Sequence, residues 1–307
     1  MRAHVAENSA HINSQIGVGT CSFLFFALTV LAVSSARGQE TTEMSLGEVS
    51  QAASDPTSGI TLLFLENQTT YFDSDPIDDR PQNSTIFQPV FAVPVAQGKW
   101  NIIARPSIRY SSSPFSEDVT DPFDRTAGLS DSSLFVLAAP SPAEGDDSSL
   151  VWGLGPTMIF PTASDDALGS GKYQLGPAAV LFRLAPEFGT RKLDSLNAGV
   201  VAQHWWSVGG DDDREEVSQT NIQYFLNYRL SPTKQLGMQP TIEIDWEADS
   251  DNRYSIPIGL GYSDTFRIGK TPMQWRIEAQ YYVIRPDDFG QEFRLQFSIA
   301  PILPSLF

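Results

Sequence analysis

The strongest constraint on the fold is a pair of long apolar segments joined by a short polar loop. The first segment, Leu150–Phe160, is apolar and interrupted by glycines, and the second, Tyr173–Leu184, begins in strict alternation. The connecting residues Thr162–Gly171 are rich in Asp, Ser and Gly, which favour turns. In the second segment an apolar face opposes a small or polar one: Tyr173, Leu175, Pro177 and Ala179 against Gln174, Gly176 and Ala178. A hairpin with these two faces is typical of a transmembrane β-barrel.

Segments of the same kind recur to the end of the chain. They are longer than the roughly 5–6 residues usual for a soluble strand and match the roughly 9–11 that a tilted strand needs to cross hydrocarbon. An even number of antiparallel strands can close, which removes the unpaired edge that lipid would penalise. The sequence therefore predicts an all-β fold, a closed antiparallel up-and-down transmembrane β-barrel of about twelve strands. The predicted strands lie at about 60–72, 84–95, 99–112, 132–140, 148–161, 171–184, 194–207, 217–230, 236–248, 253–266, 272–285 and 291–303.

Alternation alone does not distinguish a membrane barrel from a soluble sandwich, but the connections do. With both termini in the periplasm, every outward loop is acidic, as in Gly209–Glu216. Four of the five inward turns carry Lys99, Lys192, Lys234 or Lys270, and Ser141–Asp147 is the exception. Aromatic residues also adjoin the turns and loops, as expected of two interfacial girdles. The predicted girdle consists of Trp100, Tyr110, Tyr173, Trp206, Tyr228, Trp246, Tyr254 and Trp275.

The polar face of each strand is predicted to line the lumen. An arginine facing lipid at the midplane would cost about 2–4 kcal/mol, so the charged residues of the strands belong inside. They either create a transverse field that selects solutes or form a salt-bridged network that fills a modest barrel, and the sequence leaves both readings open. The predicted lumen-lining charges are Arg105, Arg109, Arg229, Glu243, Asp245, Glu247, Arg276, Glu278 and Arg294.

The N-terminal residues predict export. Residues 1–38 contain the apolar run Cys21–Val33, which has the length of a signal-peptide core, and we expect cleavage before Gln39. An uncleaved anchor is the alternative. Residues 39–59 form a polar lead-in in which Met44–Ala53 predicts a short helix, ended by Asp55-Pro56, that either stays in the periplasm or plugs the lumen. The barrel is predicted over residues 60–307.

Composition excludes several classes of function. Acidic residues outnumber basic ones by 37 to 20, which argues against a nucleic-acid partner. With one cysteine and three histidines, the sequence predicts no metal site, no cofactor and no catalytic residue. Asp211–Asp213 with Glu215 and Glu216 lack the spacing of a calcium loop and are interpreted as a solvated acidic loop. His204 would need a serine for lipase chemistry, and Ser207 is predicted on the opposite face.

Short motifs along nearly the whole mature chain resemble one known family. That family is a set of bacterial outer-membrane β-barrels labelled as transporters of the meta-pathway of phenol degradation, some of which also carry the label neuromedin U. The resemblance implies a Gram-negative outer-membrane location and uptake of hydrophobic or aromatic compounds, and it supplies no catalytic residues. The residues that carry it are Trp100-Asn101, Arg105-Pro106, Gly128–Asp131, Gly155-Pro156, Phe160–Ala163, Leu168–Lys172, Leu175–Ala179, Gln203–Trp206, Gly210–Arg214, Asn221–Tyr228 and Trp246–Asp249.

Three functions remain as hypotheses. The first is a channel or uptake protein in the cell outer membrane that passes small, hydrophobic or aromatic molecules through a charged lumen. The second is a structural or adhesive barrel with a filled lumen, and the third is a barrel lipid hydrolase that uses His204. The predicted partners are outer-membrane lipid and a small-molecule solute, and the sequence fixes neither the solute nor the oligomeric state.

Overall fold

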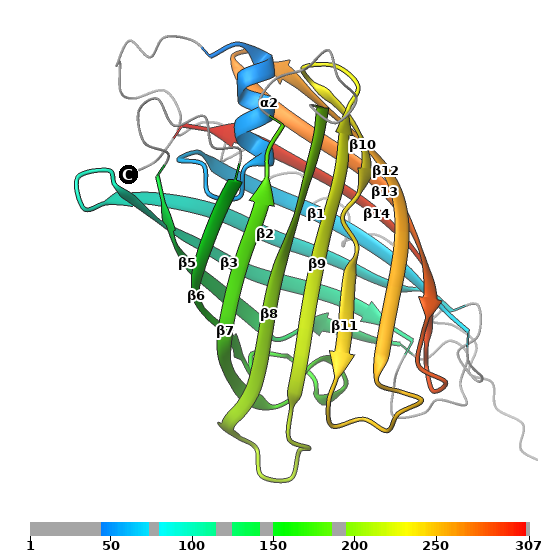
Figure 1. Cartoon of the computed structure of the whole chain (residues 1–307). Helices are drawn as coiled ribbons and strands as arrows, with labels where there is room; N and C mark the ends of the chain where they lie inside the picture. The colour runs from blue at the N-terminus through cyan, green and yellow to red at the C-terminus, as the bar shows by residue number, and fades with distance from the viewer. Residues whose placement is uncertain (1–43, 74–79, 115–124, 142–149, 186–194, 305–307) are drawn as a thin grey trace, which may run out of the picture. The chain divides into compact units, whose positions relative to one another are not determined.

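The computed structural model describes residues 44–73, 80–114, 125–141, 150–185 and 195–304 (Figure 1). The predicted export signal, residues 1–38, and the first residues of the lead-in lie outside this part of the chain. The strands are β1 Thr61–Phe72, β2 Gln82–Val95, β3 Trp100–Ser113, β4 Thr126–Leu129, β5 Ser132–Pro140, β6 Leu150–Phe160, β7 Lys172–Arg183, β8 Leu196–Gly210, β9 Ser218–Arg229, β10 Lys234–Met238, β11 Thr241–Asp245, β12 Tyr254–Ile268, β13 Thr271–Ile284 and β14 Gln291–Leu303.

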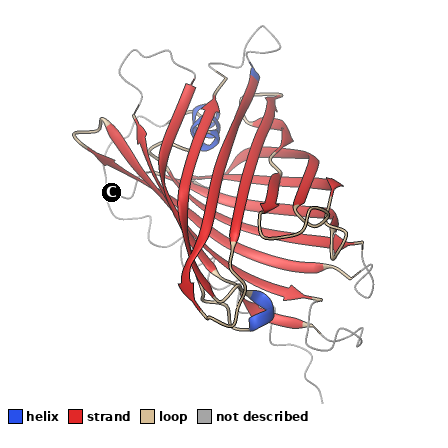
Figure 2. Cartoon of the chain, turned by 60° about the horizontal axis from the view of Figure 1, so that its bottom comes forward, coloured by secondary structure: helices blue, strands red, loops and turns tan. Residues whose placement is uncertain are grey.

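These strands form a closed 12-strand antiparallel β-barrel, which confirms the predicted fold. β1 pairs with β14, so the first strand meets the last and the described barrel has no free edge there. β4 and β5 share one position beside β3, and β10 and β11 share the position between β9 and β12. With the end opposite α2 brought forward, strands are seen on the near and the far side of the wall (Figure 2).

One predicted strand differs from the observed one, and one observed strand was not predicted. The predicted segment at 236–248 is broken after Met238 and ends at Asp245. Pro240 lies in the break, where it has no N–H to give to the ladder, although its carbonyl still accepts from Tyr224 N at 3.1 Å. The short strand β4 falls in the stretch expected to be loop, because four residues are too few to show a period of two.

The lead-in contains the predicted short helix, α2, at Leu46–Ser54. It begins at a capping box in which Ser45 and Glu48 each bond the other's backbone N–H, and it ends at Asp55, before Pro56. Thr265 Oγ1 lies 3.1 Å from Ser50 Oγ, so the helix lies against the inner face of the barrel at the end that holds the short turns (Figure 1). No helix in the described ranges is long and apolar enough to cross a membrane.

The two faces of the wall follow the predicted alternation. On β13 the side chains of Ile277, Tyr281 and Val283 are 42%, 48% and 49% exposed, whereas Glu278 and Tyr282, between them in sequence, are 1% exposed. The apolar side chains therefore face outward and the polar ones face the interior, as in a barrel surrounded by lipid.

The interior also has an apolar part that the sequence analysis did not predict. Buried apolar side chains from β2, β3, β5, β7 and β8 form one cluster on the inner wall. A smaller cluster joins Val49 of α2 to Leu62, near the start of β1, and to Ile302, near the end of β14. These contacts hold the helix against the wall. The members of the larger cluster are Ala92, Ile103, Phe135, Leu137, Ala139, Ala178, Val180, Phe182 and Val201.

Candidate functional site

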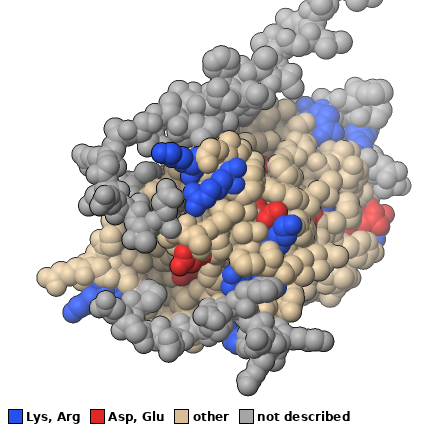
Figure 3. Space-filling model, turned by 90° about the horizontal axis from the view of Figure 1, so that it is seen from above, with Lys and Arg blue, Asp and Glu red and all other residues tan. Residues whose placement is uncertain are grey.

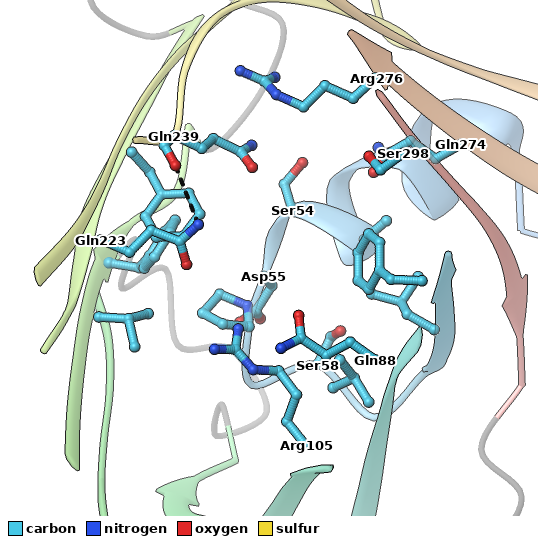
Figure 4. A pocket seen from close by; sticks show the side chains of 18 of the residues that line it. Ser54, Asp55, Ser58, Gln88, Arg105, Gln223, Gln239, Gln274, Arg276 and Ser298 are labelled. Carbon is cyan, nitrogen blue, oxygen red and sulfur yellow. Dashed lines mark hydrogen bonds between the residues drawn. The ribbon is translucent and has the colours of Figure 1, made fainter. Parts of the chain in front are cut away.

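The candidate site is a cavity in the barrel interior, next to the residues that follow α2 (Figure 4). Its volume is about 170 Å³. Ser54, Asp55 and Ser58 reach it from the lead-in, and Gln88, Gln223 and Gln274 reach it from three different strands. Because the strands on opposite sides of the barrel have different inner faces, the cavity has an apolar wall and a polar wall.

The apolar wall is built from inward-facing residues of the larger buried cluster. Phe135 and Leu137 of β5 and Phe182 of β7 line the cavity, and the Phe182 ring lies 4.8 Å from that of Phe225 on β9. Side chains alternate between the two faces of a strand, so these residues point inward while their neighbours in sequence face outward. A solute in this cavity would therefore contact aromatic and aliphatic carbon on one side.

The polar wall is organised around a buried ion pair on β13. Arg276 Nη2 lies 2.6 Å from Glu278 Oε2, with side chains 7% and 0% exposed. Arg276 also donates to Asn227 Oδ1 at 3.2 Å and to the Gly237 carbonyl at 3.1 Å, and Gln280 Nε2 donates to Glu278 Oε1 at 3.0 Å. The structure thus brings Arg276 and Glu278, two of the predicted lumen charges, together in one hydrogen-bonded ion pair.

A second charged cluster surrounds Glu66, a residue that was not among the predicted lumen charges. Glu66 on β1 accepts from Gln68 Nε2 at 2.7 Å and from Gln296 Nε2 at 2.6 Å. Arg109 and Arg294 both attract its carboxylate. The alternation Leu62, Phe64, Glu66, Gln68 does place Glu66 inward, but the apolar residues at the start of β1 hide the pattern.

The remaining predicted charges lie in different places. Arg105 lines the cavity, whereas Arg229 is buried near the turns, where its Nη2 lies 3.5 Å from the Pro232 carbonyl. Glu243 on β11 attracts Arg109. Asp245 ends β11 and Glu247 follows in the loop, both exposed. The structure thus places Asp245 and Glu247 at the loop end of the wall, away from the cavity.

Seven of the eight predicted girdle residues are exposed on the outer wall. Trp275 is the exception, half-buried with its ring 5.6 Å from that of Tyr262. Trp152, which was not predicted, is 41% exposed and packs edge-on against Trp100 at 6.1 Å. The exposed set is Trp100, Tyr110, Tyr173, Trp206, Tyr228, Trp246 and Tyr254.

Charged side chains differ between the two ends of the barrel. Seen from the α2 end, Lys and Arg side chains lie on several sides of the rim, with a few Asp and Glu side chains among them (Figure 3). At the other end Glu216 lies in an exposed acidic loop, and hydrogen bonds from Ser207 and Lys172 lower the pKa of its carboxyl. The Lys172 ammonium lies 3.0 Å from Glu216 Oε1. Among the described residues, no group of three or more His, Cys, Asp or Glu side chains could hold a metal ion.

The surroundings of His204 do not form a catalytic triad. Its Nδ1 lies 2.7 Å from Thr220 Oγ1, and Trp246 Nε1 donates to the same oxygen at 2.8 Å. Its Nε2 is buried and has no hydrogen-bond partner among the described residues, so none of their carboxylates orients the ring. Ser207 instead bonds Glu216, as expected if it faces the other way.

No family model and no curated protein matches the chain, but solved structures do. The crystal structure of the COG4313 outer membrane channel from Pseudomonas putida F1 aligns with a TM-score of 0.56 and 14% identity, over 80% of this chain and 96% of that one. The NanC porin aligns with a TM-score of 0.45 and 14% identity, over 77% of this chain and 98% of that one. Outer membrane phospholipase A from Escherichia coli aligns with a TM-score of 0.38 and 11% identity, over 80% of this chain and 91% of that one. At these identities the likeness is one of fold, and this chain has the barrel fold of the COG4313 outer membrane channel.

Proposed function

We propose that this chain is an outer-membrane channel that passes small, largely apolar molecules through a lumen narrowed by α2. The observation that carries the proposal is the interior cavity, which has an apolar wall opposite a polar one. A purely structural barrel needs only a filled interior, whereas this arrangement offers both carbon contacts and hydrogen bonds to a solute. The first of the structural neighbours is itself named an outer membrane channel.

The position of α2 supports a lumen that is narrow at rest. Besides the Val49 cluster and the contact between Ser50 and Thr265, two neutral hydrogen bonds join it to the wall, from Gln51 Nε2 to the Ala185 carbonyl at 2.9 Å and from Gln235 Nε2 to Ser54 Oγ at 2.9 Å. Neutral hydrogen bonds of this kind each contribute only about 1 kcal/mol, because water replaces them readily. Because the apolar contacts of Val49 add to these bonds, we expect α2 to leave the wall only transiently and the channel to open intermittently.

The exposed aromatic residues and the basic turns support the proposed location. The outward apolar face would contact acyl chains, and the rings at its two edges would lie at the interfaces. In this proposal the α2 end faces the periplasm, and residues 1–38 direct export before they are removed.

Planar-bilayer recording of the mature chain tests the proposal. We expect small, discrete conductance steps with long closed intervals, together with flux of small neutral aromatic solutes into proteoliposomes. Proteoliposomes that contain an unrelated closed barrel are the control for leakage.

The competing function is a structural barrel with a filled lumen. The buried clusters and the bonded pair of Arg276 and Glu278 favour it, because their side chains fill space in the interior. Correctly folded protein that gives neither conductance nor solute flux would establish this second function and reject the channel.

A further inference from the structure

The inward-facing arginines differ in one respect. Arg109, Arg229, Arg276 and Arg294 each donate at least one hydrogen bond. The guanidinium of Arg105 makes none to any residue that the structure describes, and its Nε is buried. A partly buried cation without hydrogen-bond partners is costly unless something else binds it. Arg105 therefore has donors to offer inside the cavity that it lines.

The immediate surroundings of Arg105 are apolar on one side. Its guanidinium carbon lies 4.9 Å from the centre of the Phe135 ring. Ile103, two residues earlier on the same strand, lines the cavity and is 1% exposed. A ligand with a planar apolar group would thus contact the carbon atoms of these side chains next to the guanidinium of Arg105. Figure 4 shows Arg105 pointing into the cavity from the wall opposite Arg276.

The nearby carboxylates of the chain do not use these donors. Glu66 also lines the cavity and attracts Arg105, but it forms no hydrogen bond with it, and its two oxygens accept from Gln68 and Gln296. Its charge is also shared with Arg109 and Arg294. Asp55, which lines the same cavity, accepts from Thr57 N and Thr57 Oγ1, each at 2.8 Å. Among the residues that the structure describes, the guanidinium of Arg105 thus has no bonded anion.

We infer that Arg105 binds the carboxylate of a small apolar monoanion in this cavity. A guanidinium matches a carboxylate with two parallel hydrogen bonds, and the Phe135 side of the cavity suits a ring or a short aliphatic body. At about 170 Å³, the cavity is smaller than the roughly 300–1,000 Å³ of pockets for drug-sized ligands, so the ligand is a single-ring or short-chain acid. The inference rests on the proposed function, in which the lumen is the path of the solute.

Calorimetric titration of the mature chain in detergent with three matched probes tests the inference. The probes are benzoate, its neutral isostere benzamide and its cationic isostere benzamidine. We expect benzoate to bind at least tenfold more tightly than benzamide, and benzamidine to bind most weakly. Arg105→Gln should weaken benzoate at least tenfold and change benzamide by less than twofold, which also shows that the variant is folded.

Two further variants serve as controls. Arg105→Lys keeps the charge and should retain part of the preference for benzoate. Arg229→Gln removes an inward arginine that does not line the cavity and should leave all three affinities unchanged. Equal binding of benzoate and benzamide, unchanged benzoate affinity in Arg105→Gln, or no benzoate binding at all would overturn the inference. The titration is independent of the conductance measurement. Benzoate binding through Arg105 in a protein that shows no conductance would therefore reject the channel and keep the binding site.

Discussion

Both carboxylate oxygens of Glu278 accept the backbone N–H of Gln239, at 2.9 and 3.1 Å. Glu278 lies on β13 and Gln239 lies between β10 and β11, so the carboxylate reaches across the inner face of β12. It can do so because β12 has glycines there: a Cβ on Gly259 would lie 2.7 Å from Glu278 Oε1. The polar wall of the cavity is therefore held by the backbone as well as by charge.

Glu278→Gln should destabilise the barrel by about 3 kcal/mol, because it leaves Arg276 buried without its counter-ion. Denaturant-induced unfolding in detergent measures the loss. The matched control is Glu292→Gln, which removes the 3.9 Å contact with Arg285 between side chains 44% and 29% exposed. An exposed pair contributes about 0–1 kcal/mol, so equal losses in the two variants would contradict the structure.

Gly261→Ala should shift the same ion pair. The new Cβ would lie 2.8 Å from the Ile277 carbonyl oxygen and 2.9 Å from Arg276 Nη2, so the strand or the arginine must move. We expect a loss of about 1–3 kcal/mol in the same unfolding measurement. Gly59→Ala, which meets nothing within 4 Å, should be neutral, and a neutral Gly261→Ala would show that β12 does not pack as described.

The barrel and its charged strands were predictable because their two faces differ in chemistry. On β13 the inward Arg276 and Glu278 alternate with outward apolar residues, so the period of two identifies both faces. On β7 the inward Val180 and Phe182 alternate with Ala179 and Leu181, and two apolar faces give no such signal. For that reason the sequence predicted a charged lumen and missed its apolar wall.

The bonding state of each charged residue was not predictable. Arg105 and Arg276 both stand at inward positions of regular strands, yet Arg105 makes no ion pair with a described carboxylate, whereas Arg276 has its carboxylate two residues away. Partners such as Asn227 for Arg276 come from strands that are distant in sequence, and their registers set the pairing. Single-strand patterns carry no information about that geometry.

Locking α2 to the wall should reduce conductance. Ser50→Cys combined with Thr265→Cys replaces two hydroxyls whose oxygens lie 3.1 Å apart, so oxidation can join the helix to β12. We expect fewer and shorter open events in the oxidised protein and recovery after reduction. Each single variant, treated with the same oxidant, is the control. Unchanged conductance in the cross-linked protein would show that α2 does not limit passage.

Asp55 should make the docking of α2 depend on pH. Burial raises the pKa of its carboxyl above the ordinary value of 3.8, despite the opposing hydrogen bonds from Thr57. Between the ordinary pKa of Asp55 and its raised pKa in the folded state, the folded protein binds more protons than the unfolded chain. The free energy of unfolding therefore falls as the pH rises through this window. Hydrogen exchange of the α2 amides should therefore report weaker protection above the window than below it, after correction for the intrinsic rate. Asp55→Asn should remove the dependence, and an identical pH profile in the variant would assign it to another group.

Trp205 and Trp206 are neighbours in sequence that should report opposite sides of the wall. Trp206 is 50% exposed on the outer face, whereas Trp205 is 4% exposed and its Nε1 donates to Thr157 Oγ1 inside the barrel at 3.1 Å. In single-tryptophan variants reconstituted with brominated lipid, we expect strong quenching of Trp206 fluorescence and little quenching of Trp205. Trp205 and Trp206 are adjacent on β8 and therefore lie at nearly the same depth. A difference in quenching thus reports the side of the wall and not the depth in the membrane. Strong quenching at Trp205 with none at Trp206 would mean that the apolar face does not contact lipid, and the membrane barrel would have to be abandoned.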